Sequence, residues 1–250
     1  MAVRRAGFTG RIIGVSSPAA IQTALSRGAI DQGLSLEEAV SHADVIYLAR
    51  PIEQILRTLD IISGHVKVGA LVTDAGSTKR AICARAGKSL PGVRFVGGHP
   101  MAGKESRGVE HAEAGLFEGR PYVLTSRDSA LEEWIAKIGA KLVFLSPAKH
   151  DRLVGLASHL PQMLSTALGS ALADEPEAVS VAGPGAMDMT RLAMSSYEIW
   201  HDILATNGDT IESALDGIIG KLEMLRATLR SPEMEKEFER AAKAARELRA

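Results

Sequence analysis

The chain contains the stretches Val72-Thr-Asp-Ala-Gly-Ser-Thr-Lys79 and Phe95-Val-Gly-Gly-His-Pro-Met-Ala-Gly103. Each starts in a short apolar run and ends in a glycine-rich turn with one chemically useful side chain, Ser77 in the first and His99 in the second. Open α/β sheets bind ligands where their strands end, and glycine lets the backbone approach a ligand closely. We therefore expect a hydroxyl and an imidazole on neighbouring strand ends.

Around these stretches, residues 1–146 alternate between two patterns. Short apolar runs cover residues 11–16, 44–49, 70–74, 94–96, 121–125 and 141–145, and helical patterns cover residues 19–26, 52–62, 78–86, 105–116 and 130–138. Ser35-Leu-Glu-Glu38 is a capping box that predicts a further short helix. Alternating strands and helices predict a doubly wound, Rossmann-like α/β domain with a mostly parallel sheet. The runs are continuously apolar, which predicts strands buried on both faces.

Residues 147–250 predict a second, all-α domain that begins after Ser146-Pro147. Apolar residues recur at helical spacing over residues 151–172 and 199–229, with Pro161 expected to kink the first of these helices. We expect a loop at residues 173–185 and a solvated, charged helix at residues 233–250. The apolar residues exceed what one layer of helices can bury, which predicts a twofold homodimer through this domain.

Composition narrows the class of protein. The chain has 250 residues, a net charge of −1, 46% hydrophobic residues and a single cysteine, Cys83. This balance predicts neither a nucleic-acid partner nor a disulfide framework. No apolar run approaches the roughly 18–20 residues that span a membrane, and no signal peptide is recognisable. We therefore expect a cytoplasmic protein with no membrane partner, and the spacing of His, Asp and Glu predicts no metal site.

Six motifs follow one another in a characteristic order. They are Asp74-Ala-Gly-Ser-Thr-Lys79, Gly97-Gly-His-Pro-Met-Ala-Gly103, Leu116-Phe-Glu-Gly-Arg-Pro-Tyr-Val-Leu124, Ser158-His-Leu-Pro161, Asp188-Met-Thr-Arg-Leu-Ala193 and Trp200-His-Asp-Ile203 with Asn207. With these motifs the chain resembles the prephenate/arogenate dehydrogenase family of tyrosine biosynthesis. A set of this size is far more specific than any single match.

The resemblance implies an oxidative decarboxylation of prephenate to 4-hydroxyphenylpyruvate, or of arogenate to tyrosine, with hydride transfer to NAD or NADP. It implies that His99 is the base and that Ser77 orients the reacting groups. It also implies a substrate site formed by Arg191, His159, Lys104 and Trp200. The cofactor site would contain Ser16, Ser17, Ala49, Pro51, Gly76 and Ser77.

Several of these residues also have a purely structural interpretation. Ser77 could be the N-cap of the next helix, a role compatible with the first. His159 could satisfy backbone groups freed by the kink at Pro161. Arg191 could form an ion pair on a helix surface, and Trp200 could belong to the core.

The chain departs from the family pattern at its start. No Gly-x-Gly-x-x-Gly turn is present, and Met1-Ala-Val-Arg-Arg-Ala-Gly-Phe8 resembles the end of the helix that should follow such a turn. We expect the chain to be truncated, to lack the central first strand of the sheet, and to bind the nucleotide poorly or not at all. Ser16 stands where an acidic residue usually contacts the ribose of NAD, so NAD and NADP both stay open.

The sequence leaves more than one substrate and more than one function open. Lys104 replaces a small hydroxyl residue, so Lys104 and Gln162 leave prephenate and arogenate equally open. One alternative function is another NAD(P)-dependent dehydrogenase of the same architecture, of the 3-hydroxyacid or 6-phosphogluconate type. The other is a catalytically impaired homologue that acts only as a helical dimer module.

Overall fold

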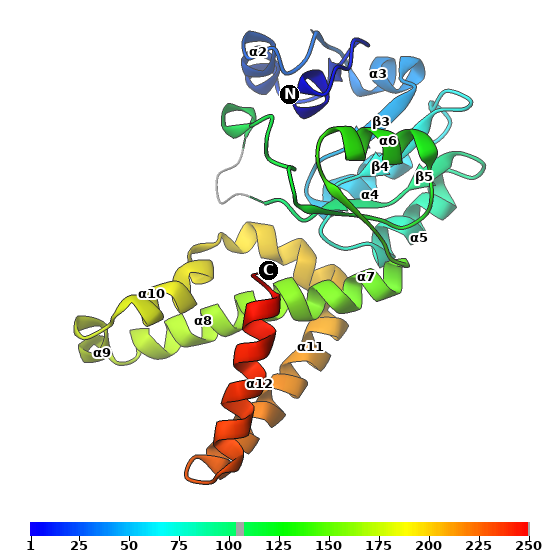
Figure 1. Ribbon diagram of the computed structural model, residues 1–250. Coiled ribbons are helices and arrows are strands. Elements are labelled where there is room, and N and C mark those ends of the chain that lie inside the picture. The colour runs from blue at the N-terminus through cyan, green and yellow to red at the C-terminus, as the bar shows by residue number, and fades with distance from the viewer. Residues whose placement is uncertain (104–107, 250) are drawn as a thin grey trace.

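The computed structural model describes residues 1–103 and 108–249. Strands and helices alternate in its first part, and the second part consists of helices (Figure 1). In Figure 1, α7 and α8 run below the α/β part, and α11 and α12 form an arm that points away from it.

The elements of the α/β part agree closely with the sequence pattern. The strands are β1 (Ile13–Gly14), β2 (Gln32–Gly33), β3 (Val45–Leu48), β4 (Leu71–Asp74), β5 (Arg94–Val96), β6 (Gly98–Pro100), β7 (Pro121–Leu124) and β8 (Lys141–Phe144). The helices are α1 (Ala2–Arg5), α2 (Pro18–Ser26), α3 (Leu36–His42), α4 (Ile52–Ile61), α5 (Arg80–Ser89) and α6 (Ser129–Lys137). The capping box is confirmed, since Ser35 and Glu38 bond each other's backbone N–H at the start of α3. The strands β2 and β6, of two and three residues, were not expected from the sequence pattern.

The strands form three separate ladders. β1 pairs with β2, and β3-β4-β5 form a second ladder, in both cases in parallel. β7 pairs with β6 in antiparallel and with β8 in parallel orientation. Within the described residues no ladder joins β1 to β3. The strand pairs are therefore mostly parallel, as predicted.

Strand β3 corrects the prediction that every strand is buried on both faces. All residues of β4 are buried, whereas burial alternates along β3. Val45 is 54% and Tyr47 46% exposed, while Ile46 and Leu48 are in the core. Because successive side chains point to opposite faces of a sheet, one face of β3 lacks a covering layer in the described structure.

Two other expectations were wrong. In place of a helix over residues 105–116, the described part of this segment has only the 3₁₀ turn η1 (Val109–His111). This turn follows Gly108, whose φ of 98° is not helical. The loop expected at residues 173–185 contains α9 (Pro176–Ser180) and the start of α10 (Pro184–Thr190). Proline is favoured in the first turn of a helix, so these two prolines start helices rather than interrupt them.

The remaining helical elements surround one long rod. The rod consists of α7 (Pro147–Val154), the π-helical turn η2 (Gly155–His159) and α8 (Leu160–Ala173). The elements that follow α10 are the 3₁₀ turn η3 (Arg191–Met194), α11 (Tyr197–Thr228) and α12 (Glu233–Glu247). Pro161 lies in the first turn of α8, directly after the π turn, so the expected irregularity is present. Helix α12 contains no buried residue, as expected of a solvated helix.

The two parts of the chain share a hydrophobic core. Ile203 and Ile211 of α11 are buried in the same cluster as Ile52, Ile55 and Leu59 of α4. The α/β part and the helical part are therefore packed together through α4 and α11. In the described residues no helix is both long and apolar enough to cross a membrane.

Candidate functional site

His99 is buried in β6, directly after two glycines. Its side chain is 9% exposed, and its Nδ1 lies 2.9 Å from Nε2 of His150 in α7. A Cβ atom at Gly98 would lie 2.6 Å from the carbonyl oxygen of Asp74. Only glycine fits there, so the approach of β6 to the end of β4 places His99 beside the turn that contains Ser77.

His150 continues into a second buried hydrogen bond. Its Nδ1 lies 2.7 Å from Oδ1 of Asp151, and both side chains are fully buried. Asp151 also accepts the backbone N–H groups of Lys79 at 2.6 Å and Arg80 at 2.9 Å. Because the N-cap Lys79 offers no side-chain hydrogen bond of its own, Asp151 caps the N-terminus of α5 from the helical part.

A buried ion pair fixes the turn between β4 and α5. The ammonium group of Lys79 contacts the carboxylate of Asp74 and donates to the carbonyl oxygen of Gly98 at 2.6 Å. Asp74 in turn accepts the backbone N–H groups of Gly76 and Gly98. The ends of β4 and β6 are thus joined through one lysine and one aspartate.

Ser77 lies within this fixed turn and is half-buried. The N-cap of α5 is Lys79, so the N-cap interpretation of Ser77 is wrong. Asp151 takes that role, which leaves the Ser77 hydroxyl without a hydrogen-bond partner among the residues that the structure describes.

His159 and Trp200 are side by side, as the resemblance implied for a common pocket. Their rings form an edge-to-face contact with centroids 5.8 Å apart. His159 is 1% exposed and its Nδ1 is 3.2 Å from the amide nitrogen of Asn207. The His159 ring is therefore held between α8 and α11.

Asn207 connects the Asp151 part of the network with His159. The sequence had assigned it no role. Its amide nitrogen also donates to the carbonyl oxygen of Asp151 at 2.9 Å, and its Oδ1 accepts from Arg80 at 3.1 Å. Its backbone leaves helical geometry, with φ −138°, and kinks α11. The kink brings this amide to the point where α5, α7 and η2 meet.

Arg191 is exposed. It begins the 3₁₀ turn η3, directly after α10. The backbone N–H of Ala193 donates to Ser165 Oγ at 2.9 Å, which fixes η3 against α8. Lys104, the remaining expected substrate residue, lies outside the described residues.

Burial controls the charge state of the two central imidazoles. The pKa of His99 is well below its usual value, first because the ring is buried, and also because a positive charge on it would be opposed by Lys79 and by any proton on His150 or His159. Burial likewise lowers the pKa of His159 to about 4, although Asp151 opposes the shift. Both rings are neutral at neutral pH, so His99 is in the form that accepts a proton.

The candidate cofactor residues follow three strands. Ser16 and Ser17 follow β1, Ala49 and Pro51 follow β3, and Gly76 with Ser77 follows β4. Leu48 is paired with Asp74, so the last two groups share one sheet edge. Ser17, in the other ladder, accepts the N–H of Ala20 and caps α2.

These residues fit only part of a dinucleotide. The available hydroxyl of Ser77 at the sheet edge suits the carboxamide of a nicotinamide. A pyrophosphate needs a glycine-rich turn with several free N–H groups, and the described strand-to-helix turns place Pro18 and Pro51 at the starts of α2 and α4 instead. Gly76 does not provide a free N–H group, because its backbone N–H already donates to the Asp74 carboxylate at 2.8 Å.

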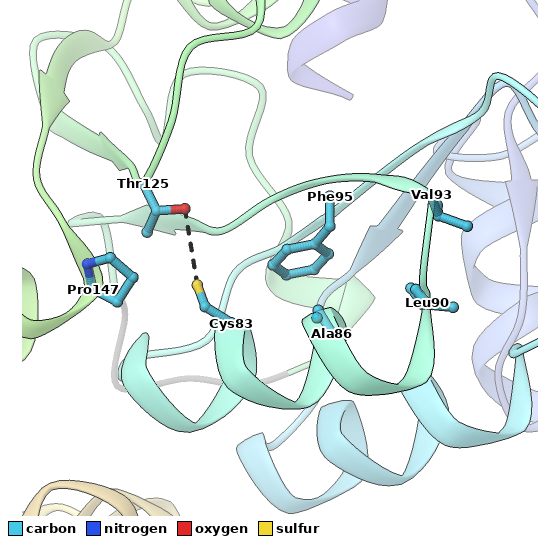
Figure 2. Close-up of a pocket in the computed structure, with 8 residues that line it drawn as sticks. Cys83, Ala86, Leu90, Val93, Phe95, Thr125 and Pro147 are labelled. Carbon is cyan, nitrogen blue, oxygen red and sulfur yellow. Dashed lines mark hydrogen bonds between the residues drawn. The ribbon is translucent and has the colours of Figure 1, made fainter.

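A hollow of about 320 Å³ lies apart from these residues, between α5, β5 and the start of α7 (Figure 2). It is lined by Cys83, Ala86, Gly87, Leu90, Val93, Phe95, Thr125 and Pro147. Burial raises the pKa of the Cys83 thiol to about 11, so the thiol is unreactive at neutral pH. Within the described chain, no three His, Cys, Asp or Glu residues are grouped to hold a metal ion.

Comparison with known families decides the class of this fold. Residues 1–145 match the model "prephenate dehydrogenase, nucleotide-binding domain", and residues 146–243 match "prephenate dehydrogenase, dimerization domain". The chain belongs to the prephenate dehydrogenase family. The resemblance and the fold class predicted from the sequence, a nucleotide-binding α/β part followed by a helical part, are thereby confirmed.

Curated relatives of this family align over most of the chain. Prephenate dehydrogenase of Lactococcus lactis subsp. cremoris is 35% identical over 83% of this chain and 60% of its own length. Prephenate dehydrogenase of Bacillus subtilis is 32% identical over 91% of this chain and 66% of its own length. The chain thus spans less than two thirds of the length of these two relatives.

Solved structures of the family superpose on almost the whole chain. Prephenate dehydrogenase from A. aeolicus, in complex with hydroxyphenyl propionate and NAD⁺, has a TM-score of 0.92 and 29% identity, with coverage of 99% of this chain and 92% of that one. Synechocystis arogenate dehydrogenase has a TM-score of 0.85 and 30% identity, with coverage of 99% and 94%.

The sequence indicated no role in the site for Asp151 or Asn207, and His150 was only one of the polar residues that could face the cleft between the two halves. The adjacent pair His150-Asp151, just after the predicted boundary at Ser146-Pro147, was an available signal, since polar side chains near a boundary between domains are well placed to line a site there. Asn207 stood in a motif of the resemblance, but nothing in the sequence indicated that it would kink α11.

Proposed function

We propose that the chain contains the active site of a dehydrogenase that oxidises and decarboxylates prephenate or arogenate. The observation that carries the proposal is the buried, neutral His99, which lies beside the Ser77 turn in a chain of this family. A neutral imidazole with one ring nitrogen engaged by the protein is suited to accept a proton through the other.

In this proposal His99 Nε2 takes the proton of the ring hydroxyl of the substrate, and the Ser77 hydroxyl orients that group. A bound nicotinamide supplies the hydride acceptor. Loss of carbon dioxide then makes the ring aromatic, to give 4-hydroxyphenylpyruvate from prephenate or tyrosine from arogenate. Exclusion of water around His99 strengthens its hydrogen bonds with the substrate.

Four further residues form the proposed substrate site. The guanidinium of Arg191 binds a substrate carboxylate, for which its planar fork is well suited. His159 and Trp200 form one wall, supported by their ring contact. Lys104 is the fourth residue of the proposed substrate site. Together with Gln162 it would influence whether the keto group of prephenate or the ammonium group of arogenate is preferred.

We further propose NAD or NADP as the cofactor, held by Ser16, Ser17, Ala49, Pro51, Gly76 and Ser77. The match of residues 1–145 to a nucleotide-binding domain supports the cofactor class. The absence of an acidic side chain at Ser16 leaves room for a 2′-phosphate.

Residues 1–146 and 147–250 are proposed as two domains, with a homodimer formed through the second. The match of residues 146–243 to a dimerization domain supports this assembly, as do exposed apolar side chains on α11, such as Ile219 at 50% and Leu222 at 54%. Ile203 and Ile211, which contributed to the expectation from the sequence, pack against α4 within the chain instead. We propose a cytoplasmic enzyme without a nucleic-acid or membrane partner.

The decisive experiment follows the absorbance of reduced nicotinamide with prephenate and with arogenate, each with NAD⁺ and NADP⁺. The chain is compared with an engineered version in which a strand and a Gly-x-Gly-x-x-Gly turn are added before Met1. Reduction of the nicotinamide by either version supports the proposal, and the better substrate identifies the preference. Absence of reduction in both versions, with folded protein, would refute it in favour of a non-catalytic module. Titration calorimetry with both nucleotides measures binding separately.

A further inference from the structure

We infer that His150 and Asp151 are positioning residues that fix the tautomer of His99, so that the lone pair of Nε2 is the one presented to the substrate. The inference deepens the proposed function and rests on it for its catalytic meaning. The tautomer itself is measurable without any turnover.

The argument begins at Asp151, which receives hydrogen bonds from three N–H donors. Its Oδ1 accepts the backbone N–H of Lys79 at 2.6 Å and its Oδ2 accepts that of Arg80 at 2.9 Å. A backbone N–H can only donate, and the guanidinium of Arg80 also approaches Oδ2 at 3.3 Å. The carboxyl group is thus held as an acceptor; burial raises its pKa, but these bonds and that of His150 outweigh burial and lower it.

The accepting carboxylate of Asp151 then decides which ring nitrogen of His150 carries the proton. Since Asp151 Oδ1 accepts, the Nδ1 of His150, 2.7 Å away, must carry the proton and donate it. In a neutral imidazole the other ring nitrogen then has no proton. Its Nε2 therefore has a lone pair that can only accept.

The hydrogen bond between His150 and His99 then decides which ring nitrogen of His99 carries the proton. Its Nδ1 lies 2.9 Å from the accepting Nε2 of His150, so Nδ1 carries the proton. A neutral imidazole has one donor and one acceptor nitrogen. The lone pair of His99 is thus on Nε2. Two hydrogen bonds run in one direction from His99 to Asp151, which also accepts the backbone N–H groups at the N-terminus of α5.

These hydrogen bonds also stabilise the positively charged form of His99 that results when its Nε2 accepts a proton. When Nε2 accepts a proton, the bond from Nδ1 to His150 becomes charge-assisted and stronger. The ionisable groups around this line are Lys79, Arg80, His159, Asp74 and Asp209, in addition to the three residues themselves. Lys79 is neutralised by Asp74, and Arg80 is paired with Asp209 as well as Asp151, so Asp151 is the anion in contact with His150.

Nuclear magnetic resonance of ¹⁵N-labelled histidine rings tests the tautomer directly. In the unmodified chain we expect His99 to show a protonated Nδ1 and an unprotonated Nε2 at neutral pH. His150→Leu removes the acceptor, so His99 should shift to a mixture of the two tautomers. A protonated Nε2 on His99 in the unmodified chain would overturn the inference, whatever the enzyme assays show.

Kinetics on the catalytically active version supply the second readout. His150→Leu should lower kcat about 100-fold with KM changed less than about threefold, because a wrongly protonated base still permits binding. His150→Gln should recover most of the loss, since a glutamine oxygen can accept from His99 while its amide donates to Asp151. His42→Leu, on the exposed end of α3, is the matched control.

Thermal unfolding of every variant separates a local effect from loss of the fold. If His150→Leu fails to fold, His150→Gln and the shorter His150→Asn are compared instead, and only the glutamine should retain the tautomer and the rate. Equal kcat for folded His150→Leu and the unmodified chain would contradict the inference. So would equal rates for the glutamine and asparagine variants.

Discussion

The carboxylate of Asp202 in α11 accepts the backbone N–H of Glu53 at 2.9 Å, so a residue of the helical part caps α4 in the α/β part. The N-cap residue of α4, Pro51, provides no side-chain cap itself. Asp151 does the same for α5. The two helices that begin beside the candidate cofactor edge are therefore both capped by acidic side chains from the second half of the chain. Each cap satisfies donors that a helix start leaves open and places negative charge at the positive end of the helix dipole.

Asp202→Ala should therefore destabilise the protein by about 1–2 kcal/mol, the usual effect of losing an N-cap. Asp202→Asn keeps an accepting oxygen and should lose less. Urea unfolding measures both, and Asp216→Ala, at an exposed position of the same helix, provides the control. An alanine variant as stable as the control would show that water caps α4 equally well.

His99→Asn should lower kcat by ~10²–10⁴-fold with little change in KM, because asparagine fills the space but cannot act as the base. Steady-state rates with the preferred substrate check this. His65→Asn, at a half-exposed histidine remote from the site, should leave the rate unchanged. Wild-type turnover in His99→Asn would remove this imidazole from the mechanism.

Arg191→Ala should act on binding rather than on chemistry. Loss of a charge-assisted hydrogen bond of about 1.5–3 kcal/mol corresponds to a rise in KM of roughly 10- to 100-fold. Arg191→Lys keeps the charge but not the planar fork, and should give an intermediate KM. The role as a carboxylate ligand fails if KM is the same in all three proteins.

Lys79→Met should destabilise the protein by about 3–5 kcal/mol, because it leaves the Asp74 carboxylate buried without its cation. The double variant Asp74→Asn with Lys79→Met removes both charges and should recover part of this loss. Urea unfolding of the single and double variants gives the coupling between them. Additive losses would mean that the two charges do not depend on each other.

The stability of the protein should fall on mild acidification. The pKa of His159 is lowered to about 4 by burial, against 6.5 for an unburied histidine. Below pH 6.5 the unfolded chain therefore binds a proton that the folded chain does not, and stability is lost progressively down to about pH 4. The full effect is of the order of 3 kcal/mol.

Urea unfolding at several pH values in this window tests the His159 effect. His159→Gln removes the titrating ring, so its stability should depend less steeply on pH than that of the unmodified chain. Parallel curves for the two proteins would show that His159 does not titrate as its burial predicts.

The sequence predicted the elements well where local pattern decides them. β4 and β5 and the turn with Ser77 follow from apolar runs that end in glycine, and α3 follows from its capping box. The pattern failed where tertiary structure decides. The burial of β3 depends on which layers cover it, and the helices at Pro176 and Pro184 depend on where a proline falls relative to a helix start.

The site was predictable only in part, for the same reason. His99 and Ser77 stand in distinctive glycine-rich motifs, and the pairing of His159 with Trp200 agrees with the pocket implied by the resemblance. The partners of His99 lie far along the chain, with His150 contacting it across 51 positions. No local pattern encodes such a contact, because the packing of α7 against α5 creates it.

The π-helical turn at Gly155–His159 has a consequence for how this protein can vary. It follows His150, which contacts His99, and ends at His159, which contacts Trp200, on one rod. Removing a single residue there would rotate everything beyond it by about 100° and draw it back by about 1.5 Å. Residue identities along the rod can change, but the number of residues between the two histidines sets their relative direction, so one-residue insertions and deletions in this interval are far less tolerable than substitutions.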